Sequence, residues 1–316
     1  QGLLRLYRDE GKRLVVTVEA MTEGRKWKGT TWGARWMHHS LVGLMRYLPL
    51  SGAYLFAAVF VIPFCMLFSH WGYLAQYHFF RRIRKERKPT AFWHTYVNHC
   101  RFAQIILDRF YVYAGGRFEF DIPNQQVYQQ LAEGDGGFVV LSAHVGNYEV
   151  AGYALQARDK RFNTLVYGKE AETVMANRER IFEVNNLHMI VVRQDMGHLF
   201  EMNNVLADGE SLSIPADRIF GSNRHYDLSF LGHKAVFPMG PFVLATQHEV
   251  PVLTIHVMKT SVKHYRIYIK RLEGGEGSVR ERARNLALQY VEQLEETVMQ
   301  YPTQWFNYFE FWKDEA

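Results

Sequence analysis

A histidine and a glutamate, His144 and Glu149, stand five positions apart in the segment HVGNYE, directly after an apolar run at 138–142. Side chains on one face of a regular helix are three or four residues apart. The pair can meet if the histidine ends a strand and the glutamate lies in the first turn of the following helix. The carboxylate would then orient the imidazole, which could take a proton from a hydroxyl. The alternative is chance, because the chain holds 14 histidines.

The composition allows a full hydrophobic core and favours anionic or apolar partners. The chain has 316 residues, is 48% hydrophobic and 15% aromatic, and carries a net charge of +5. This size fits two domains or one domain with a membrane-associated appendage. The positive charge suits lipid head groups, acidic carrier proteins or nucleic acid. The two cysteines, Cys65 and Cys100, form no disulfide framework, which indicates a reducing compartment or no redox role.

The N-terminal part divides into a polar tail and an apolar segment. Residues 1–26 are polar except for one strand-like run, and we interpret them as the tail of an upstream domain. Because the chain begins with Gln1, we expect it to be a segment or a processed product. Residues 27–90 are predicted to form a membrane-associated helical segment with a basic flank. Residues 91–316 are predicted to form the main domain.

The apolar segment lies between Arg46 and Arg81, a span without a single Lys, Arg, Asp or Glu. About 20 such residues suffice to cross a bilayer as a helix. Pro49 and Pro63 would bend or break that helix, so an interfacial or re-entrant helix is an alternative, as is a buried hairpin. The basic run at 81–88 then predicts the cytoplasmic side, held against anionic lipid. A merely solvated face is the alternative; nucleic-acid binding is disfavoured because no recognised module follows.

Beyond the basic run, strand-like and helical patterns alternate, which predicts an α/β fold with a mixed, partly parallel sheet flanked by helices. The expected strands are 138–142, 164–167, 189–192, 211–215, 250–257 and 265–270. The expected helices are 94–113, 127–132, 148–157, 172–185, 199–207 and 242–247. Ser278 and Glu281 form a capping box that begins a last helix ending at Gln300.

Three later segments have unusual residue types for pure packing. Residues 214–218 carry Asp217 and Arg218 from a strand end into a loop, and ligands of α/β sheets bind at such ends; a surface turn with a local ion pair is the alternative. Residues 237–241 form a Pro-x-Gly-Pro bend before an apolar helix, which can offer backbone N–H groups to an anion or can be an ordinary turn. The aromatic segment 305–312 either closes a channel for an apolar chain or docks on the core.

Taken in order, these segments resemble the bacterial lipid A biosynthesis acyltransferases, a branch of the lysophospholipid and glycerolipid acyltransferases. The resemblance is carried by the hexapeptide after a hydrophobic strand and by the ordered segments 215–218, 230–232, 237–241 and 302–305. It covers roughly residues 27–312 and includes the apolar segment with its basic flank. One departure is Tyr148, which stands where the lipid A enzymes usually have a tryptophan.

The resemblance implies a mechanism centred on His144. This histidine would take the proton from an acceptor hydroxyl while Glu149 orients the imidazole and balances its charge. The hydroxyl would attack an acyl thioester carried by acyl carrier protein, without a covalent enzyme intermediate, a cofactor or a metal. Backbone donors near Gly146 or Gly240 would meet the oxyanion.

The resemblance also implies an anionic acceptor. Arg218 would hold an anionic group of the acceptor with Asp217 fixing its geometry. Lys169 and Arg178 are further candidates for the same site, with solvated helix charges as the alternative.

The resemblance places the enzyme at the bacterial inner membrane, with its catalytic domain on the cytoplasmic side and no nucleic-acid partner. A lipid A precursor is the expected acceptor; a lysophospholipid, an amino-acid lipid or a polyene lipid would keep the same chemistry. A membrane protein that binds lipid without catalysis is a different class and would not need His144. Metal-dependent hydrolysis is disfavoured, because the sequence lacks His-Glu-x-x-His and any tight His/Asp cluster.

Overall fold

The structure of the protein is a computed structural model that describes residues 35–68, 70–155, 160–166, 186–193, 195–219 and 224–312. The chain divides into two compact units, Gln1–Thr30 and Thr31–Ala316, and every statement below concerns the second. The predictions for the tail 1–26, for Lys169 and Arg178, and for a helix over 172–185 lie outside the described residues.

A seven-stranded sheet forms the centre of this unit, in the strand order β1-β9-β8-β2-β5-β3-β4. Strand β9 runs antiparallel to β8, and the other neighbours are parallel, which confirms the predicted mixed α/β sheet. The strands are β1 (Glu119–Asp121), β2 (Phe138–Ser142), β3 (Phe162–Val166), β4 (Leu187–Val191), β5 (Ser211–Pro215), β8 (Val252–Lys259) and β9 (His264–Leu272). Strand β2 is therefore central and has partners on both sides.

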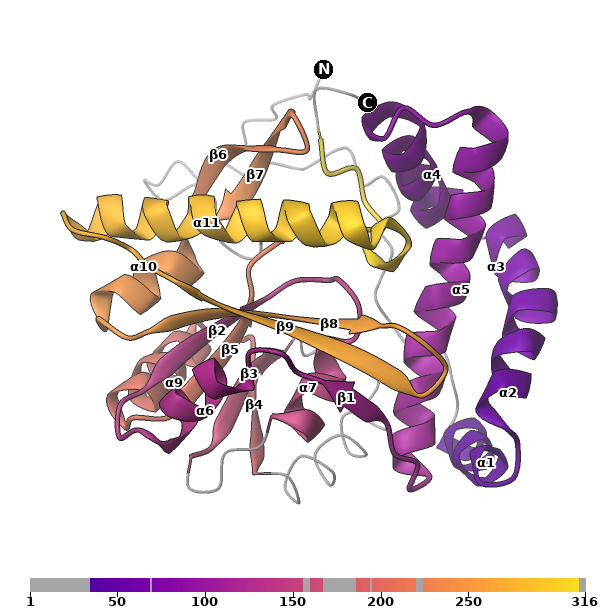
Figure 1. Cartoon of the computed structure of the whole chain (residues 1–316), viewed down its shortest axis with the longest axis horizontal. Coiled ribbons are helices and arrows are strands. Elements are labelled where there is room, and N and C mark those ends of the chain that lie inside the picture. Colours follow the sequence, from indigo (N-terminus) through magenta and orange to yellow (C-terminus); the bar gives the residue numbers. More distant parts are fainter. Residues whose placement is uncertain are drawn as a thin grey trace, which may run out of the picture. The chain divides into compact units, whose positions relative to one another are not determined.

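Helices cover both faces of the sheet, and one long helix stands at the end where the parallel strands finish (Figure 1). Successive residues of a strand point to opposite faces, so Val139 and Leu141 pack with α9, α10 and α11 while Phe138 and Val140 pack with α6 and α7. The helices on the two faces are α6 (Gln125–Glu133), α7 (Tyr148–Ala154), α9 (Gly197–Ala207), α10 (Gly240–Gln247) and α11 (Val279–Gln300). The helix at the end of the sheet is α5 (Lys88–Tyr113).

The predicted capping box at the start of α11 is present. The Ser278 side chain accepts from the Glu281 N–H, and the Glu281 carboxylate accepts from the Ser278 N–H at 2.9 Å. These bonds satisfy N–H groups that have no partner within the helix. A short 3₁₀ helix, Pro302–Gln304, follows α11.

An antiparallel hairpin, β6 (His225–Phe230) and β7 (His233–Pro238), is a feature that the sequence-based strand predictions did not include. Its two-residue turn, Leu231 and Gly232, has positive φ at both positions, 54° and 80°, as a hairpin turn matched to strand twist requires. Along β6, exposed and buried residues alternate strictly. The sequence signal for this hairpin was therefore present as an alternation of polar and apolar residues before a turn.

The apolar segment forms one continuous helical rod made of α2 (Leu50–Phe56), a π-helical turn (Ala57–Val61) and α3 (Ile62–Phe68). Pro49 stands immediately before it, and Pro63 does not break it. Proline lacks the N–H that donates within a regular helix. The π turn before Pro63, in which the Ile62 N–H bonds the Ala57 carbonyl, accommodates the missing hydrogen bond. Helix α1 (Arg35–Met45) precedes this rod, and α4 (His70–His78) and a π-helical turn (Phe79–Ile83) follow it.

By length and composition, the rod Leu50–Phe68 could cross a membrane. Only 22% of its most apolar 18-residue stretch is buried. One side packs on α5 through Ala53, Tyr54, Ala57 and neighbours, and the Ala58 carbonyl accepts from the Tyr96 hydroxyl at 2.9 Å. The remaining surface exposes large apolar side chains. These are Leu55, Phe56, Val59, Phe60, Val61, Phe64, Leu67 and Phe68. This exposure differs from the buried-hairpin alternative and agrees with contact to lipid.

The buried His256 on β8 should make stability depend on pH. Its Nδ1 lies 2.8 Å from the Thr297 hydroxyl, and burial lowers its pKa from 6.5 to about 4, although the charge of Asp217 acts in the opposite direction. Below pH 6.5 the unfolded chain binds a proton that the folded chain refuses, so stability present above pH 6.5 is lost as the pH falls towards 4. We expect a loss of about 3 kcal/mol from this group.

The measurement is urea unfolding at pH 7 and pH 4.5 for wild type and His256→Leu. The variant should lose less stability between the two pH values than wild type does. Equal losses in both proteins would show that His256 does not contribute to this pH dependence.

Candidate active site

The register of two neighbouring strands brings His144 and Asp217 together. Strands β2 and β5 are parallel neighbours, and their last residues, Ser142 and Pro215, lie opposite each other. His144 and Asp217 each follow two residues later, so both leave the sheet at the same edge. This edge, at the carboxyl ends of parallel strands, is where α/β folds bind their ligands.

Asp217 holds His144 through three contacts. The imidazole Nδ1 lies 2.8 Å from Oδ1 and 3.1 Å from Oδ2, and the backbone N–H of His144 donates to Oδ2 at 2.8 Å. The side chain of Asp217 is 2% exposed and that of His144 is 25% exposed. Burial by itself would raise the pKa of Asp217, but the charge and hydrogen bonds of His144, together with Arg218, lower it to about 2. Asp217 is therefore ionised near neutral pH and favours the imidazole tautomer with its proton on Nδ1.

The structure thus places Asp217, and not Glu149, at Nδ1 of the imidazole. Two partners of Glu149 lie on α5. They are Arg109, whose Nη2 lies 2.6 Å from Oε2, and the Tyr113 hydroxyl, 3.4 Å from Oε1. Glu149 lies in the first turn of α7, as the sequence predicts. The difference arises because helix α5 supplies a cation to Glu149, whereas the segment that follows strand β5 supplies an acid to His144.

In the turn after His144, Gly146 has a backbone conformation that glycine adopts more readily than other residues. Its φ is +55°, and a Cβ there would lie 1.9 Å from the Val257 carbonyl oxygen. Its N–H donates to the Gln304 carbonyl at 2.8 Å, and the next N–H, of Asn147, donates to the Val257 carbonyl at 2.8 Å. The Gly146 amide itself therefore bonds within the fold, and the expectation of oxyanion donors near Gly146 stays a prediction.

Arg218 ties the site to the C-terminal segment. Its Nη2 donates to the Phe306 carbonyl at 2.8 Å, and its guanidinium lies 5.3 Å from the centre of the Phe309 ring. The Nε atom is buried without a described protein partner. A guanidinium has five N–H donors, and one bond does not use all of them. The predicted contact of Arg218 with an anionic group of the acceptor stays a prediction. Gly240 begins α10, and its predicted role at the oxyanion likewise stays a prediction.

The aromatic segment 305–312 docks on the core. Trp305, Phe306, Phe311 and Trp312 are all buried, and Trp305 packs against Phe79. The Phe306 N–H donates to the His144 carbonyl at 2.8 Å, so this segment also fixes the backbone beside the imidazole. Of the two alternatives that the sequence left open, docking on the core is the one that the structure shows.

Among the described residues there is no group of three or more His, Cys, Asp or Glu side chains that could hold a metal ion. The polar constellation that the structure presents at the sheet edge is the imidazole with its buried carboxylate. Sequence reasoning found both residues, but it gave Asp217 the role of fixing Arg218 and did not match it with His144. The missing signal was the pairing of 138–142 with 211–215, after which equal spacing from the strand ends would have matched His144 with Asp217.

An imidazole with an ionised aspartate at Nδ1, at the edge of a largely parallel sheet, defines an α/β protein equipped to remove a proton from a bound group. A family model described as bacterial lipid A biosynthesis acyltransferase matches residues 117–314. The chain belongs to this family and is an acyltransferase of the lipid A acyltransferase type. A search of curated proteins gave no match. The match begins after α5, so the apolar rod and α5 lie outside it.

Proposed function

We propose that this protein transfers a fatty acyl chain from an acyl thioester to a hydroxyl of a membrane lipid, with His144 as general base. The observation that carries the proposal is the contact of His144 Nδ1 with Asp217, because it leaves Nε2 as the basic nitrogen. Nε2 has no protein partner among the described residues, and the imidazole is partly exposed. Membership in the acyltransferase family supports the choice of reaction.

The reaction balances without a covalent enzyme intermediate. The acceptor oxygen attacks the thioester carbonyl carbon while its proton passes to Nε2 of His144. The carbon–sulfur bond then breaks, and the proton on Nε2 goes to the departing sulfur, which leaves as a thiol. The products are an ester and a free thiol, and His144 returns to its starting state. Asp217 stabilises the imidazolium that exists between the two proton transfers.

The proposed donor is acyl carrier protein, and the proposed acceptor is a lipid A precursor. The net charge of +5 is compatible with an acidic carrier and with an anionic acceptor. Arg218 is the proposed contact for the anionic group of the acceptor, since it lies next to Asp217 at the same strand end. A lysophospholipid, an amino-acid lipid or a polyene lipid would use the same chemistry with another acceptor.

We further propose that the protein works at the bacterial inner membrane with the catalytic unit on the cytoplasmic side. The exposed apolar side chains of the rod Leu50–Phe68, and the basic run at 81–88 that follows it in the chain, support contact with an anionic membrane. A lipid-binding protein without catalysis would share these features. It would have no use for a partly exposed imidazole held by a buried, ionised aspartate.

The test is an assay of purified full-length protein in vesicles that contain a lipid A precursor, with either acyl carrier protein or coenzyme A as the thioester carrier. Mass spectrometry should show that the mass of the acceptor increases by one acyl group. Acyl transfer should be faster from acyl carrier protein than from coenzyme A. Parallel vesicles with a lysophospholipid test the other acceptor class. If no arm yields an acylated lipid, the proposal fails and lipid binding without catalysis is favoured.

A further inference from the structure

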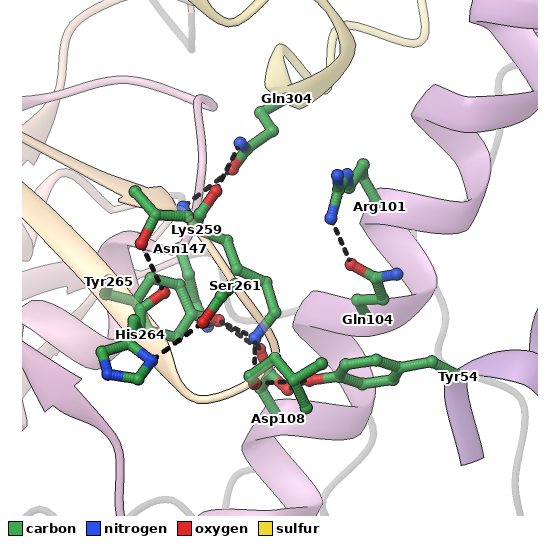
Figure 2. Close-up of polar contacts among 12 residues, drawn as sticks. Tyr54, Arg101, Gln104, Asp108, Asn147, Lys259, Ser261, His264, Tyr265 and Gln304 are labelled. Carbon is green, nitrogen blue, oxygen red and sulfur yellow. Dashed lines mark hydrogen bonds and ion pairs between the residues drawn. The ribbon is translucent and has the colours of Figure 1, made fainter. Parts of the chain in front are cut away.

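A second buried polar cluster lies beside the turn that follows His144 and takes no part in the proton transfers described above. Figure 2 shows it where the end of β8 meets α5: the Lys259 side chain reaches the Asp108 carboxylate, with Tyr54 and Tyr265 on either side. Asp108 is 0% exposed and Lys259 is 3% exposed. We define the buried junction as Asp108, Lys259, Tyr265 and Tyr54.

Asp108 is the centre of the buried junction. Lys259 Nζ lies 2.6 Å from its Oδ2, and the hydroxyls of Tyr265 and Tyr54 donate to the same carboxylate. The ammonium also lies over three aromatic rings, at 4.6 Å from the ring centre of Tyr265, 4.9 Å from Phe118 and 5.2 Å from Tyr54. A buried cation is stabilised by such a carboxylate and by ring faces.

The charges of the buried junction depend on each other. Burial raises the pKa of Asp108 and lowers that of Lys259, and in each case the charge of the partner acts against the effect of burial. A buried ion pair of this kind contributes little to stability compared with apolar residues of the same size. Its directional contacts, however, fix the orientation of every group that bonds to it.

Two hydrogen-bonded chains lead from the buried junction to the turn after His144. Asn147 donates from Nδ2 to the Tyr265 hydroxyl at 3.0 Å. Gln304 exchanges two bonds with the backbone of Lys259, both at 2.9 Å, and its own carbonyl accepts from the Gly146 N–H. The two residues that shape the turn, Gly146 and Asn147, are therefore both tied to the strand end that carries Lys259.

Helix α5 forms a second ion pair next to the one between Asp108 and Lys259. Arg109, the neighbour of Asp108, pairs with Glu149 at 2.6 Å. Two consecutive residues of α5 thus bind the two ends of the segment 147–149, one through Tyr265 and one directly. The same junction includes Tyr54 from the apolar rod, so the rod is anchored to the groups that hold the turn.

We propose that Asp108, Lys259 and Tyr265 are positioning residues for His144, and that they act by holding the Gly146–Asn147 turn through Asn147 and Gln304. The proposal deepens the function proposed above and rests on it for its catalytic consequence. Its structural consequence, a turn that loosens when the buried junction is cut, can be measured without any substrate. Small displacements of a catalytic group lower turnover while leaving substrate binding largely intact.

Tyr265→Phe cuts the chain to Asn147 by removing one hydroxyl, and Tyr128→Phe is its matched control. Both tyrosines are at most 2% exposed, and the Tyr128 hydroxyl also makes a buried bond, to the Leu155 carbonyl at 2.9 Å. Amide hydrogen exchange of the full-length protein should be about 10-fold faster at residues 143–149 in Tyr265→Phe. Exchange there should be unchanged in Tyr128→Phe. Unchanged exchange in Tyr265→Phe, or an equal rise in both variants, would overturn the proposal.

Turnover provides the second readout. We expect Tyr265→Phe to lower kcat about 10-fold with KM changed less than about 2-fold, and to have no further effect when added to Asn147→Ala, because both substitutions break one chain. Tyr128→Phe should keep the wild-type kcat. Full additivity of Tyr265→Phe and Asn147→Ala would contradict the chain.

The outcomes separate this proposal from the proposed function. An inactive wild type would reject the proposed function, and hydrogen exchange would still decide whether the buried junction holds the turn. An active wild type with a wild-type kcat in Tyr265→Phe would reject the positioning role alone.

Discussion

The His144→Ala variant is expected to turn over an acyl thioester about 10³-fold more slowly than wild type, because general-base catalysis contributes roughly 10²- to 10⁴-fold. The imidazole is the group that would take the proton from the acceptor hydroxyl, and alanine leaves no base in its place. Asp217 cannot substitute for it, since its carboxylate is 2% exposed and its pKa is about 2. The measurement is steady-state acyl transfer in vesicles at saturating donor.

His188→Ala is the matched control for this variant. His188 lies on the edge strand β4, third from β2 in the sheet, and its Nδ1 lies 3.1 Å from Asn163 Oδ1. We expect it to retain wild-type turnover. Addition of free imidazole should restore part of the activity of His144→Ala if a missing base, and not a damaged fold, causes the loss. Turnover of His144→Ala within a few-fold of wild type would refute the general-base role.

Asp217→Asn is expected to lower turnover by between about 10² and 10⁴-fold while the fold persists. Asp217 accepts the backbone N–H of His144 through one oxygen and meets the imidazole Nδ1 through both. In the amide, the single oxygen would keep the backbone bond, so the NH₂ group would face Nδ1. The imidazole would then carry its proton on Nε2, where it cannot act as a base.

Glu149→Gln is the variant that decides between the two candidate acids. Glutamine has nearly the same size, but it loses the charge that pairs with Arg109 at 2.6 Å. We expect a lower melting temperature and turnover within about tenfold of wild type, because breaking a buried ion pair costs mainly stability. Glu149→Gln and Asp217→Asn are compared by kcat per folded protein and by thermal unfolding. A loss of turnover in Glu149→Gln as large as in Asp217→Asn would assign the orienting role to Glu149.

Local patterns in the sequence predicted much of the scaffold. The strands 138–142 and 211–215 were located to the residue, and the capping box at Ser278 was recognised. The predicted strand 250–257 is shifted by two residues in the structure, and the helix predicted over 94–113 begins earlier, at Lys88. These features are readable because apolar runs, capping residues and turns depend on neighbours in the chain.

The partner of the imidazole was not readable in the same way. Glu149 is near His144 in sequence, whereas Asp217 is 73 residues away. Their meeting depends on β5 pairing with β2, while β3 and β4, which lie between them in sequence, take outer places. Strand order is decided by packing between distant segments, on which local periodicity has no bearing.

The amino-acid sequence by itself determined that a histidine closely follows an apolar strand and that an acid-bearing strand end follows later in the chain. Only the tertiary structure decided that Asp217 binds this histidine, that Glu149 pairs with α5, and that Lys259 and Asp108 meet beside the turn. The physical reason is the range of the interactions. Turns and caps form between near neighbours, whereas a buried ion pair or a strand register exists only after the whole sheet and its end helix have come together.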